Sequence, residues 1–263
     1  MRRDSALYTV VFAAGVCVVC SALVCAPTVL LRQRQALNKQ LDKQQKVLIV
    51  AGLAAEGERL SGPEVQRRFE QGIVVRAVDL EKGEFAPDGA VPDLLGYDQR
   101  RAAADPRLSV AAPPNRARVQ RLPRYATVYV VMQDGAPAKI VIPIHGKGLW
   151  STLFGFLALE RDVRTVEGII FYEHGETPGL GGEVDNPRWK ARWQGRLAFD
   201  DRGEPKIQVI RGPAGPPADD PYHVDGLSGA TITSQAVSHM LTFWLGEHGF
   251  GPFLTRLREE WRG

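Results

Sequence analysis

An uncharged, apolar run extends from Ala6 to Leu31 near the start of the chain. At about 26 residues, it is long enough to cross the roughly 30 Å hydrocarbon core of a bilayer as a helix. A cleaved signal peptide is the competing interpretation, because two arginines precede the run. However, the run exceeds the roughly 7 to 15 apolar residues usual in a signal peptide, and its small-residue cleavage signal is followed directly by Pro27. We therefore expect residues 1–31 to contain a retained transmembrane helix.

Mixed polar and apolar positions follow this run. Leucine and valine recur among glutamine and lysine between residues 32 and 55, which predicts a helix rising from the membrane. Pro63 is placed to open a second, short helix that ends near Gly72. The alternation from Ile73 to Asp79 then predicts a strand.

The stretch from Phe85 to Pro123 is rich in proline, alanine, arginine and aspartate. Its repeated prolines interrupt any regular pattern, so we interpret it as a long surface excursion rather than a second core. Residues 32–124 are thus predicted to hold membrane-proximal helices, a strand and this excursion.

The pattern from Tyr125 to the end of the chain predicts a domain over residues 125–263. The first two strands flank the turn residues 134–137, which favours a hairpin. Strands and helices interleave around one sheet, so the predicted class is α+β, with a mainly antiparallel sheet and flanking helices. The predicted strands are Ala126–Gln133, Lys139–Ile144, Val163–Tyr172 and Lys206–Ile210, and the predicted helices are Trp150–Leu157, Asn186–Gln194, Thr231–Gly246 and Pro252–Trp261.

Charge and cysteine content exclude some classes of function. The formal net charge is +3, from 33 basic and 30 acidic residues spread along the chain, without the basic clusters of a nucleic-acid surface. All three cysteines, Cys17, Cys20 and Cys25, lie in the apolar run, so the rest of the chain has neither a disulfide framework nor a thiolate metal site. Cysteine is a common filler of apolar helices, although Cys17 and Cys20 share a helix face that could ligate a metal with a partner chain.

The charges beside the apolar run leave its orientation open. Five basic residues follow the run within the next helix, against two before it, and a literal positive-inside reading would place the large domain in the cytoplasm. Long domains, however, translocate largely regardless of flanking charge.

A cluster of hydroxyl residues occurs where a helix is predicted to begin, in the segment Ser228-Gly-Ala-Thr-Ile-Thr-Ser234. A helix start offers free backbone N–H donors and partial positive charge, and Gly229 and Ala230 would let a phosphate approach the backbone closely. The plainer interpretation is that Ser228 or Thr231 caps the helix. Spacing alone leaves both interpretations open.

Two upstream glycine-rich loops are further candidates. His174 to Gly182 exposes backbone donors, although as a bare pattern it is equally a flexible turn. In Pro143 to Trp150, Lys147 could meet a phosphate and the Trp150 indole could stack on an aromatic ring, or the two could be a turn lysine and a core tryptophan. The sequence contains no HExxH zinc motif and no Gly-x-Ser-x-Gly elbow.

Taken together, these segments resemble the C subunit of the Na⁺-translocating NADH:quinone oxidoreductase and, more distantly, the G subunit of the Rnf electron-transport complex. The resemblance covers nearly the whole chain and is weakest from Phe85 to Pro123. It is carried by the N-terminal run, the region from Asn38 to Leu53, Gly146-Lys-Gly-Leu-Trp150, Tyr172-Glu-His-Gly-Glu-Thr-Pro-Gly-Leu-Gly181, Asp185-Asn-Pro-Arg-Trp189 and Asp225-Gly-Leu-Ser-Gly-Ala-Thr231.

The resemblance implies an FMN-binding domain whose cofactor is joined by a phosphoester to the Thr231 hydroxyl, a bond made by a separate flavin transferase. It places Ser228, Gly229 and Ala230 around the phosphate, and it implies that Trp150, Glu176, Thr177, Leu180 and Gly181 lie against the flavin ring or ribityl chain. With the redox chemistry supplied by the cofactor, we expect no catalytic residue and no metal ligand in this chain. We expect it to relay electrons within a multisubunit, sodium-translocating NADH:ubiquinone reductase.

The same resemblance implies a single-pass protein of the cell inner membrane with its large domain in the periplasm, and no nucleic-acid partner. Two alternatives remain from the sequence. One is an Rnf-type G subunit, which is also a flavin carrier. The other is a membrane-tethered binding module without a redox group.

Overall fold

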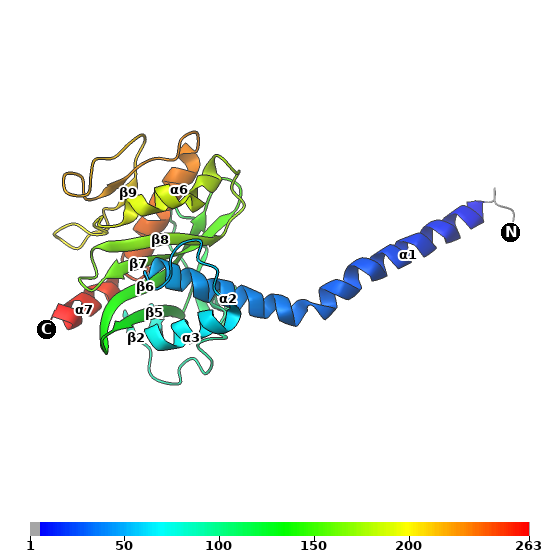
Figure 1. Ribbon diagram of the computed structural model, residues 1–263, viewed down its shortest axis with the longest axis horizontal. Coiled ribbons are helices and arrows are strands. Elements are labelled where there is room, and N and C mark those ends of the chain that lie inside the picture. Colours follow the sequence, from blue (N-terminus) through cyan, green and yellow to red (C-terminus); the bar gives the residue numbers. More distant parts are fainter. Residues whose placement is uncertain (1–5, 263) are drawn as a thin grey trace. The chain divides into compact units, whose positions relative to one another are not determined.

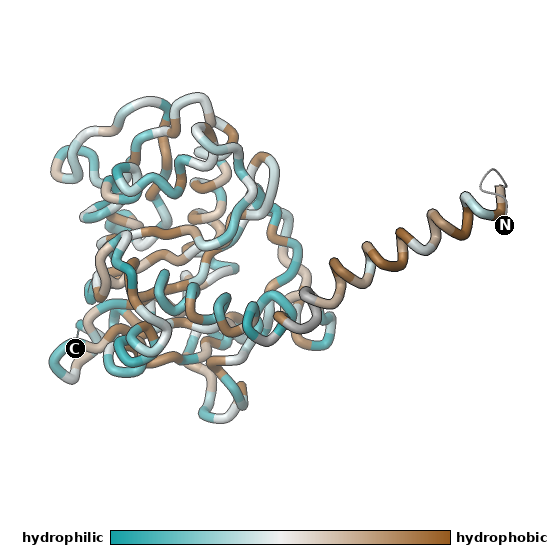
Figure 2. The backbone as a smooth tube through the Cα atoms, turned by 45° about the vertical axis from the view of Figure 1, so that its right-hand side comes forward, coloured by the Kyte–Doolittle hydropathy of each residue, from teal (hydrophilic) through white to brown (hydrophobic). Residues whose placement is uncertain are grey.

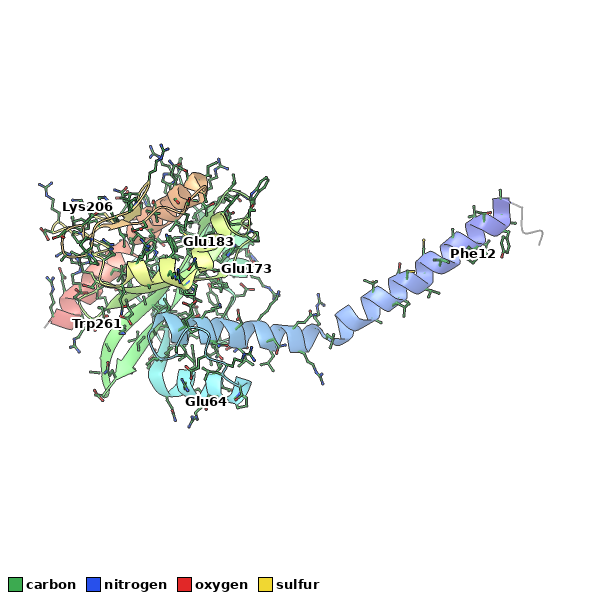
Figure 3. The ribbon with its side chains drawn as sticks, turned by 45° about the horizontal axis from the view of Figure 1, so that its top comes forward. Phe12, Glu64, Glu173, Glu183, Lys206 and Trp261 are labelled. Carbon is green, nitrogen blue, oxygen red and sulfur yellow. The ribbon has the colours of Figure 1, made fainter. Side chains whose placement is uncertain are left out.

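The computed structural model describes residues 6–262, apart from the side chains of residues 27–30 and 33. It divides into two compact units, Met1–Lys43 and Gln44–Gly263. In the first unit, α1 (Ala6–Leu30) is followed by the start of α2 (Arg32–Val50). The 21 residues from Ala6 to Ala26 have a mean hydropathy of 2.5, and none of the most apolar window is buried. Figure 2 shows the apolar colouring of this helix, and Figure 3 shows Phe12, 63% exposed, pointing away from it. Its length and composition suit a membrane span.

The second unit is organised around a six-stranded sheet with the order β2-β1-β5-β6-β7-β8 (Figure 1). Every neighbouring pair in this sheet is antiparallel. The strands are β1 (Ile73–Asp79), β2 (Glu84–Phe85), β5 (Tyr125–Gln133), β6 (Ala136–Lys147), β7 (Thr152–Glu160) and β8 (Val166–Glu173). The predicted α+β class with a mainly antiparallel sheet is confirmed.

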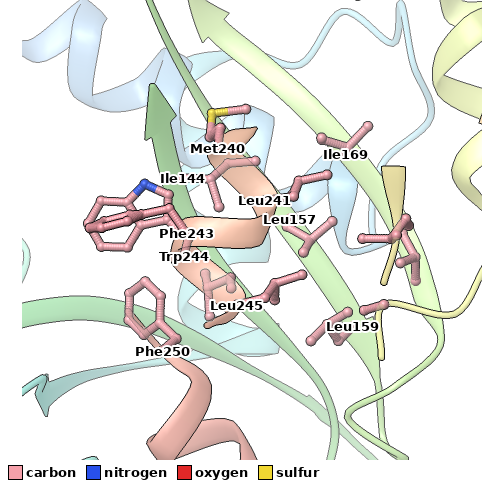
Figure 4. Packing of buried hydrophobic residues seen from close by; sticks show 14 of the residues in the cluster. Ile144, Leu157, Leu159, Ile169, Met240, Leu241, Phe243, Trp244, Leu245 and Phe250 are labelled. Carbon is pink, nitrogen blue, oxygen red and sulfur yellow. The ribbon is translucent and has the colours of Figure 1, made fainter. Parts of the chain in front are cut away.

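Helices cover both faces of this sheet. On one face, α6 (Thr231–Leu245) and α7 (Gly251–Arg262) close the main core, where Leu241 and Trp244 pack on Ile144 and Leu157 (Figure 4). On the other face lie the end of α2 and α3 (Gly62–Gly72). There the ring centroid of Phe69 lies 6.0 Å from that of Tyr129.

Short elements connect these layers. A hairpin of β3 (Ser109–Ala111) and β4 (Arg121–Pro123) follows α4 (Gln99–Ala104), and the parallel pair β9 (Gln208–Val209) and β10 (His223–Val224) precedes α6. Between β8 and β9 the chain forms η1 (Gly181–Asp185), α5 (Pro187–Lys190) and η2 (Ala191–Trp193).

The predicted helix Trp150–Leu157 is wrong, because this segment turns and then enters β7. As a strand between β6 and β8 with both faces covered, β7 is apolar almost throughout, so periodicity could not separate strand from helix. Gly155 makes the strand possible, since a Cβ at this position would lie 2.5 Å from the Ile170 carbonyl oxygen.

Four other expectations need correction. The helix predicted to reach residue 55 ends at Val50, and the helix predicted over residues 186–194 is a single α turn followed by a 3₁₀ turn. The stretch from Phe85 to Pro123 is not only a surface excursion, because Ala117, Val119 and Leu122 are buried in the main core. β1 also pairs with β5, so the sheet draws strands from both sides of the predicted boundary at residue 124.

Candidate functional site

The hydroxyl-rich segment lies at the first turn of α6, as predicted, but no hydroxyl caps the helix. The N-cap residue is Ala230, and no side chain accepts a capping hydrogen bond there. Thr231 is the first helical residue and is exposed, as is Ser228. Gly229 has a φ of +71°, which explains why a glycine stands in the turn before the helix. The interpretation of Ser228 or Thr231 as an ordinary N-cap is therefore wrong.

An uncapped helix start can bind an anion. The first N–H groups of a helix have no intrahelical acceptor, and the helix dipole adds partial positive charge at this end. Here both features occur at the helix start that carries Thr231, which is exposed. The geometry suits a phosphate held on or beside that hydroxyl.

A buried carboxylate joins the three candidate segments. Glu176, 5% exposed, accepts hydrogen bonds from the backbone nitrogens of Leu149, Trp150 and Ser151, with distances of 3.3, 3.0 and 3.3 Å. It also accepts a bond of 2.7 Å from the Thr233 hydroxyl in the first turn of α6. This single side chain therefore ties the loop before β7 to the start of α6. We refer to these five residues as the Glu176 clamp.

Two glycines leave room for this carboxylate. A Cβ on Gly148 would lie 2.6 Å from one oxygen of Glu176, and a Cβ on Gly181 would lie 2.8 Å from the other. The predicted site residue Gly181 thus has a steric role that the structure shows directly. Its hypothetical Cβ would also lie 2.6 Å from the Thr233 hydroxyl oxygen.

The pKa of Glu176 lies below its ordinary value. Burial acts to raise this pKa, but the hydrogen bonds from Thr233, Trp150, Ser151 and Leu149 favour the ionised form and outweigh burial. The clamp therefore holds a negative charge at neutral pH.

Large apolar side chains are exposed around the clamp. Trp150 is 67% exposed, and Leu149, Leu180 and Ile232 are between 44% and 55% exposed. A Cβ on Gly229 would lie 3.0 Å from the Leu180 side chain, so the loop after β8 contacts the segment that carries Thr231. Leu149 and Trp150 belong to the clamp, Ile232 precedes Thr233 of the clamp, and Leu180 precedes Gly181, which lies against Glu176. We refer to these four side chains together as the apolar platform, and their exposure makes a flat apolar ligand a suitable partner.

An open groove of about 1590 Å³ lies along one face of α6. Among the described residues, Ser228, Gly229 and Thr231 line it, whereas Ala230 and the predicted residues Trp150, Glu176, Thr177, Leu180 and Gly181 do not. The structure therefore does not gather all predicted site residues into one cavity. Thr231 borders the groove and, through Ile232 and Thr233, adjoins the platform and the clamp.

The remaining candidates have structural partners. Lys147 donates to the Trp150 carbonyl at 3.0 Å, and His174 pairs with Asp185 at 2.8 Å. Burial and, second, the charge of Arg100 lower the pKa of His145 to about 4, so this ring is neutral at physiological pH. Thr177 is exposed, and its carbonyl accepts bonds from the loop that follows.

Sequence reasoning did not identify Thr233 and Ser151 as parts of this site. Thr233 stands 57 residues from Glu176 in the chain, and no local pattern marks such a pair. Ser151 accepts a bond of 2.6 Å from the Gly175 nitrogen, which fastens the loop after β8 a second time. The sequence signal that could have pointed to this site is the pair Gly148 and Gly181, because the structure places both glycines against the Glu176 carboxylate.

Comparisons with known proteins agree with this geometry. The family described as FMN-binding domain matches residues 148–246. Relatives include the C subunit of the Na(+)-translocating NADH-quinone reductase of Pseudomonas aeruginosa, 47% identical over 98% of both chains. The protein of that name from Yersinia pestis is 43% identical over 98% of this chain and 95% of its own.

Solved structures agree as well. The crystal structure of Shewanella oneidensis NqrC matches with a TM-score of 0.77 and 33% identity, covering 84% of this chain and 99% of that one. The C subunit of the Na(+)-translocating NADH-quinone reductase from Parabacteroides distasonis matches with a TM-score of 0.65 and 30% identity, over 86% and 97% of the two chains.

Proposed function

The chain belongs to the C-subunit family of the Na(+)-translocating NADH-quinone reductase, and we propose that it relays electrons between other subunits through FMN held by a phosphoester on Thr231. The family places it in a redox-driven translocase complex, and its FMN-binding domain spans residues 148–246. The observation that carries the attachment site is the exposed Thr231 hydroxyl at an uncapped helix start. The relatives match over nearly their whole length, which favours this family over an Rnf-type flavin carrier or a module without a redox group.

The other hydroxyls of the segment are poorer candidates. Thr233 is 1% exposed and donates to Glu176, and Ser234 is 4% exposed and accepts a bond from the Leu227 nitrogen. Neither can react without breaking these contacts. Ser228 is exposed and is the remaining rival, but it stands three residues before the helix, whereas Thr231 is the first helical residue.

The residues around Thr231 fit FMN, a group that takes up and releases one or two electrons. The free N–H groups of α6 suit its phosphate, and the apolar platform suits its ring. In this proposal Glu176 is not a direct flavin ligand, because its carboxylate already accepts four hydrogen bonds. It instead fixes the Leu149–Ser151 turn relative to the helix that carries Thr231.

The attachment site is tested by peptide mapping after co-expression with a flavin transferase. The intact chain should gain the mass of FMN less one water. Trypsin should release the peptide from Gly212 to Arg256, which contains all four candidate hydroxyls. Fragmentation should place the added mass on Thr231, and placement on Ser228, Thr233 or Ser234 would overturn the assignment.

We also propose that α1 anchors the protein in the inner membrane with the large domain in the periplasm. The apolar helix supports the anchor, whereas the basic residues after it favour the opposite orientation under the positive-inside rule. Because long domains translocate largely regardless of flanking charge, these basic residues do not rule out the periplasmic orientation. Alkaline phosphatase fused after Gly263 should be active, and green fluorescent protein fused there should be dark. The reverse pair of results would place the domain in the cytoplasm.

A further inference from the structure

The carboxylate of the Glu176 clamp has only neutral hydrogen-bond partners. It accepts from the three backbone nitrogens of residues 149–151 and from the Thr233 hydroxyl. Within residues 6–262, Glu176 is the one glutamate that is buried, and no ion pair there includes it. Neutral donors favour the ionised form of a carboxylate, but they leave its net charge in place. The clamp therefore keeps one full negative charge inside the fold.

The cations of the surrounding segments are engaged elsewhere or exposed to solvent. The Lys147 ammonium donates to the Trp150 carbonyl, and His174 pairs with Asp185. Three further cations line the groove along α6, and all of them are exposed: Arg116, Lys206 and Arg211. Water and salt screen exposed charges much more strongly than buried ones. These cations therefore offset the buried carboxylate only in part.

The apolar platform lies directly over this charge. Leu149 and Trp150 donate their backbone N–H groups to the carboxylate, whereas their side chains are 45% and 67% exposed. Leu180 precedes Gly181, and a Cβ on that glycine would lie 2.8 Å from a Glu176 oxygen. A flat ring lying on these exposed side chains would be separated from the carboxylate by the platform residues alone.

A buried charge acts on such a ring through protein rather than through water. When a flavin takes up one electron without a proton, its charge becomes more negative by one unit, and the carboxylate opposes this change. At an effective dielectric constant of about 20, a unit charge acting over about 10 Å changes a one-electron equilibrium by roughly tenfold. The N–H groups of residues 149–151 cannot stabilise the added charge, because they already donate to Glu176.

From these contacts we propose that Glu176 sets the reduction potential of the flavin and holds it lower than a neutral side chain at this position would. The inference rests on the proposed attachment of FMN to Thr231, with its ring on the apolar platform. Glu176 is a positioning residue, because it touches the turn and the helix rather than the ring. A lower potential makes the reduced flavin a stronger donor to the next electron carrier.

The test is a redox titration of the full-length, flavin-loaded chain in detergent, followed by the flavin absorbance. Glu176→Gln removes the charge and keeps the shape of the side chain. At a fixed solution potential, the ratio of reduced to oxidised flavin should rise about tenfold in this variant, which corresponds to about 59 mV for a one-electron couple. Circular dichroism of the same samples shows whether the variant is folded.

Two control variants separate charge from loosened packing. Thr233→Val breaks one hydrogen bond of the clamp but leaves the carboxylate in place, so it should not raise the ratio of reduced to oxidised flavin. Glu173→Gln makes the same charge change three residues away, at an exposed side chain that already pairs with Arg100 (Figure 3). Because this charge is paired and screened, its loss should change the ratio by less than about twofold.

A second measurement uses the wild-type chain and needs no variant. Coupling between two sites is reciprocal, so a flavin whose reduction is opposed by a carboxylate must in turn perturb that carboxylate when it is reduced. The infrared difference spectrum between the reduced and oxidised chain should therefore contain a carboxylate band that shifts when glutamate is labelled with carbon-13. Glu176 is the buried glutamate of the described residues, and exposed carboxylates respond weakly because water screens them.

Three results would overturn the proposal. The first is a folded Glu176→Gln chain with the wild-type potential. The second is a Thr233→Val chain whose potential rises as much, which would assign the effect to loosened packing. The third is a wild-type difference spectrum without a glutamate carboxylate band, and this result decides the matter if Glu176→Gln does not fold or carries no flavin. A wild-type chain that gains no covalent flavin would instead overturn the proposed function, and this inference with it.

Discussion

Replacing Thr231 by alanine is expected to abolish covalent flavin on this chain. Thr231 is the exposed hydroxyl at the free start of α6, and the two buried hydroxyls of the same turn are engaged in hydrogen bonds. The purified variant should show neither the added mass nor a fluorescent band on a denaturing gel. In the assembled complex, NADH-driven quinone reduction should fall to background, because the covalent carrier is missing from the chain of electron transfer.

Two further substitutions test whether the loss of covalent flavin is specific to the Thr231 hydroxyl. Thr231→Ser keeps a hydroxyl at the same place and should retain the adduct. The lost methyl group should change only the rate at which flavin is attached. Ser228→Ala removes the other exposed hydroxyl of the turn and should leave the adduct at the wild-type level. An unchanged adduct in Thr231→Ala, with loss in Ser228→Ala, would move the attachment to Ser228.

The second large effect is expected at Glu176, where the folded state depends on one carboxylate. Glu176→Ala leaves three backbone N–H groups and the Thr233 hydroxyl without an acceptor in a buried site. Each buried, unsatisfied group costs about 1–3 kcal/mol, but entering water compensates in part, so we expect a loss of roughly 3–5 kcal/mol in the free energy of unfolding. Urea denaturation of the flavin-free chain measures this loss.

Conservative variants separate the clamp from a general packing effect. Glu176→Gln keeps the shape but turns an NH₂ group toward the donors of the Leu149–Ser151 turn, so it should cost about 1–3 kcal/mol. In a double-mutant cycle, Glu176→Gln and Thr233→Val should show a coupling of about 0.5–3 kcal/mol, because the two side chains are in direct contact. The exposed Glu260→Gln should change stability by less than about 0.5 kcal/mol. Additive losses in the cycle would show that the hydrogen bond contributes nothing.

The Glu176 clamp also predicts how the free energy of unfolding changes with pH in the acid range. The pKa of Glu176 in the folded state lies below the unfolded value of 4.5, so the folded state binds its proton less readily. Its contribution is fully present above about pH 5 and is lost as the pH falls through the folded pKa. Stability measured from pH 6 down to pH 3 should therefore fall less steeply in Glu176→Gln than in the wild type.

Much of the architecture was predictable from local patterns. The strand Ile73–Asp79 and the helix from Thr231 were identified within about one residue of their bounds. The hairpin was predicted with its turn at residues 134–137, although its second strand, β6, extends three residues further at each end than predicted. These elements carry strong local signals: alternation, a turn with positive φ at both Asp134 and Gly135, and a regular apolar face. The segment from Trp150 to Leu157 failed because a strand buried on both faces carries no alternation.

The sequence by itself determined the family, because the resemblance is carried by short local segments, such as Gly146 to Trp150 and Asp225 to Thr231, that can be recognised without tertiary contacts. The same resemblance implied Thr231 as the attachment residue, whereas the hydroxyl-rich helix start alone was open to two interpretations. The sequence could not decide what Glu176 does. The neighbours of that carboxylate come from loops and a helix far apart in the chain, so only folding shows that its oxygens bind Thr233 and the turn at Trp150. Likewise, Ala230 rather than a hydroxyl occupies the N-cap, and the groove of exposed cations forms only when the segments of Arg116 and Arg211 meet α6. Local propensity specifies elements, whereas long-range packing decides which polar groups are satisfied and which remain free to react.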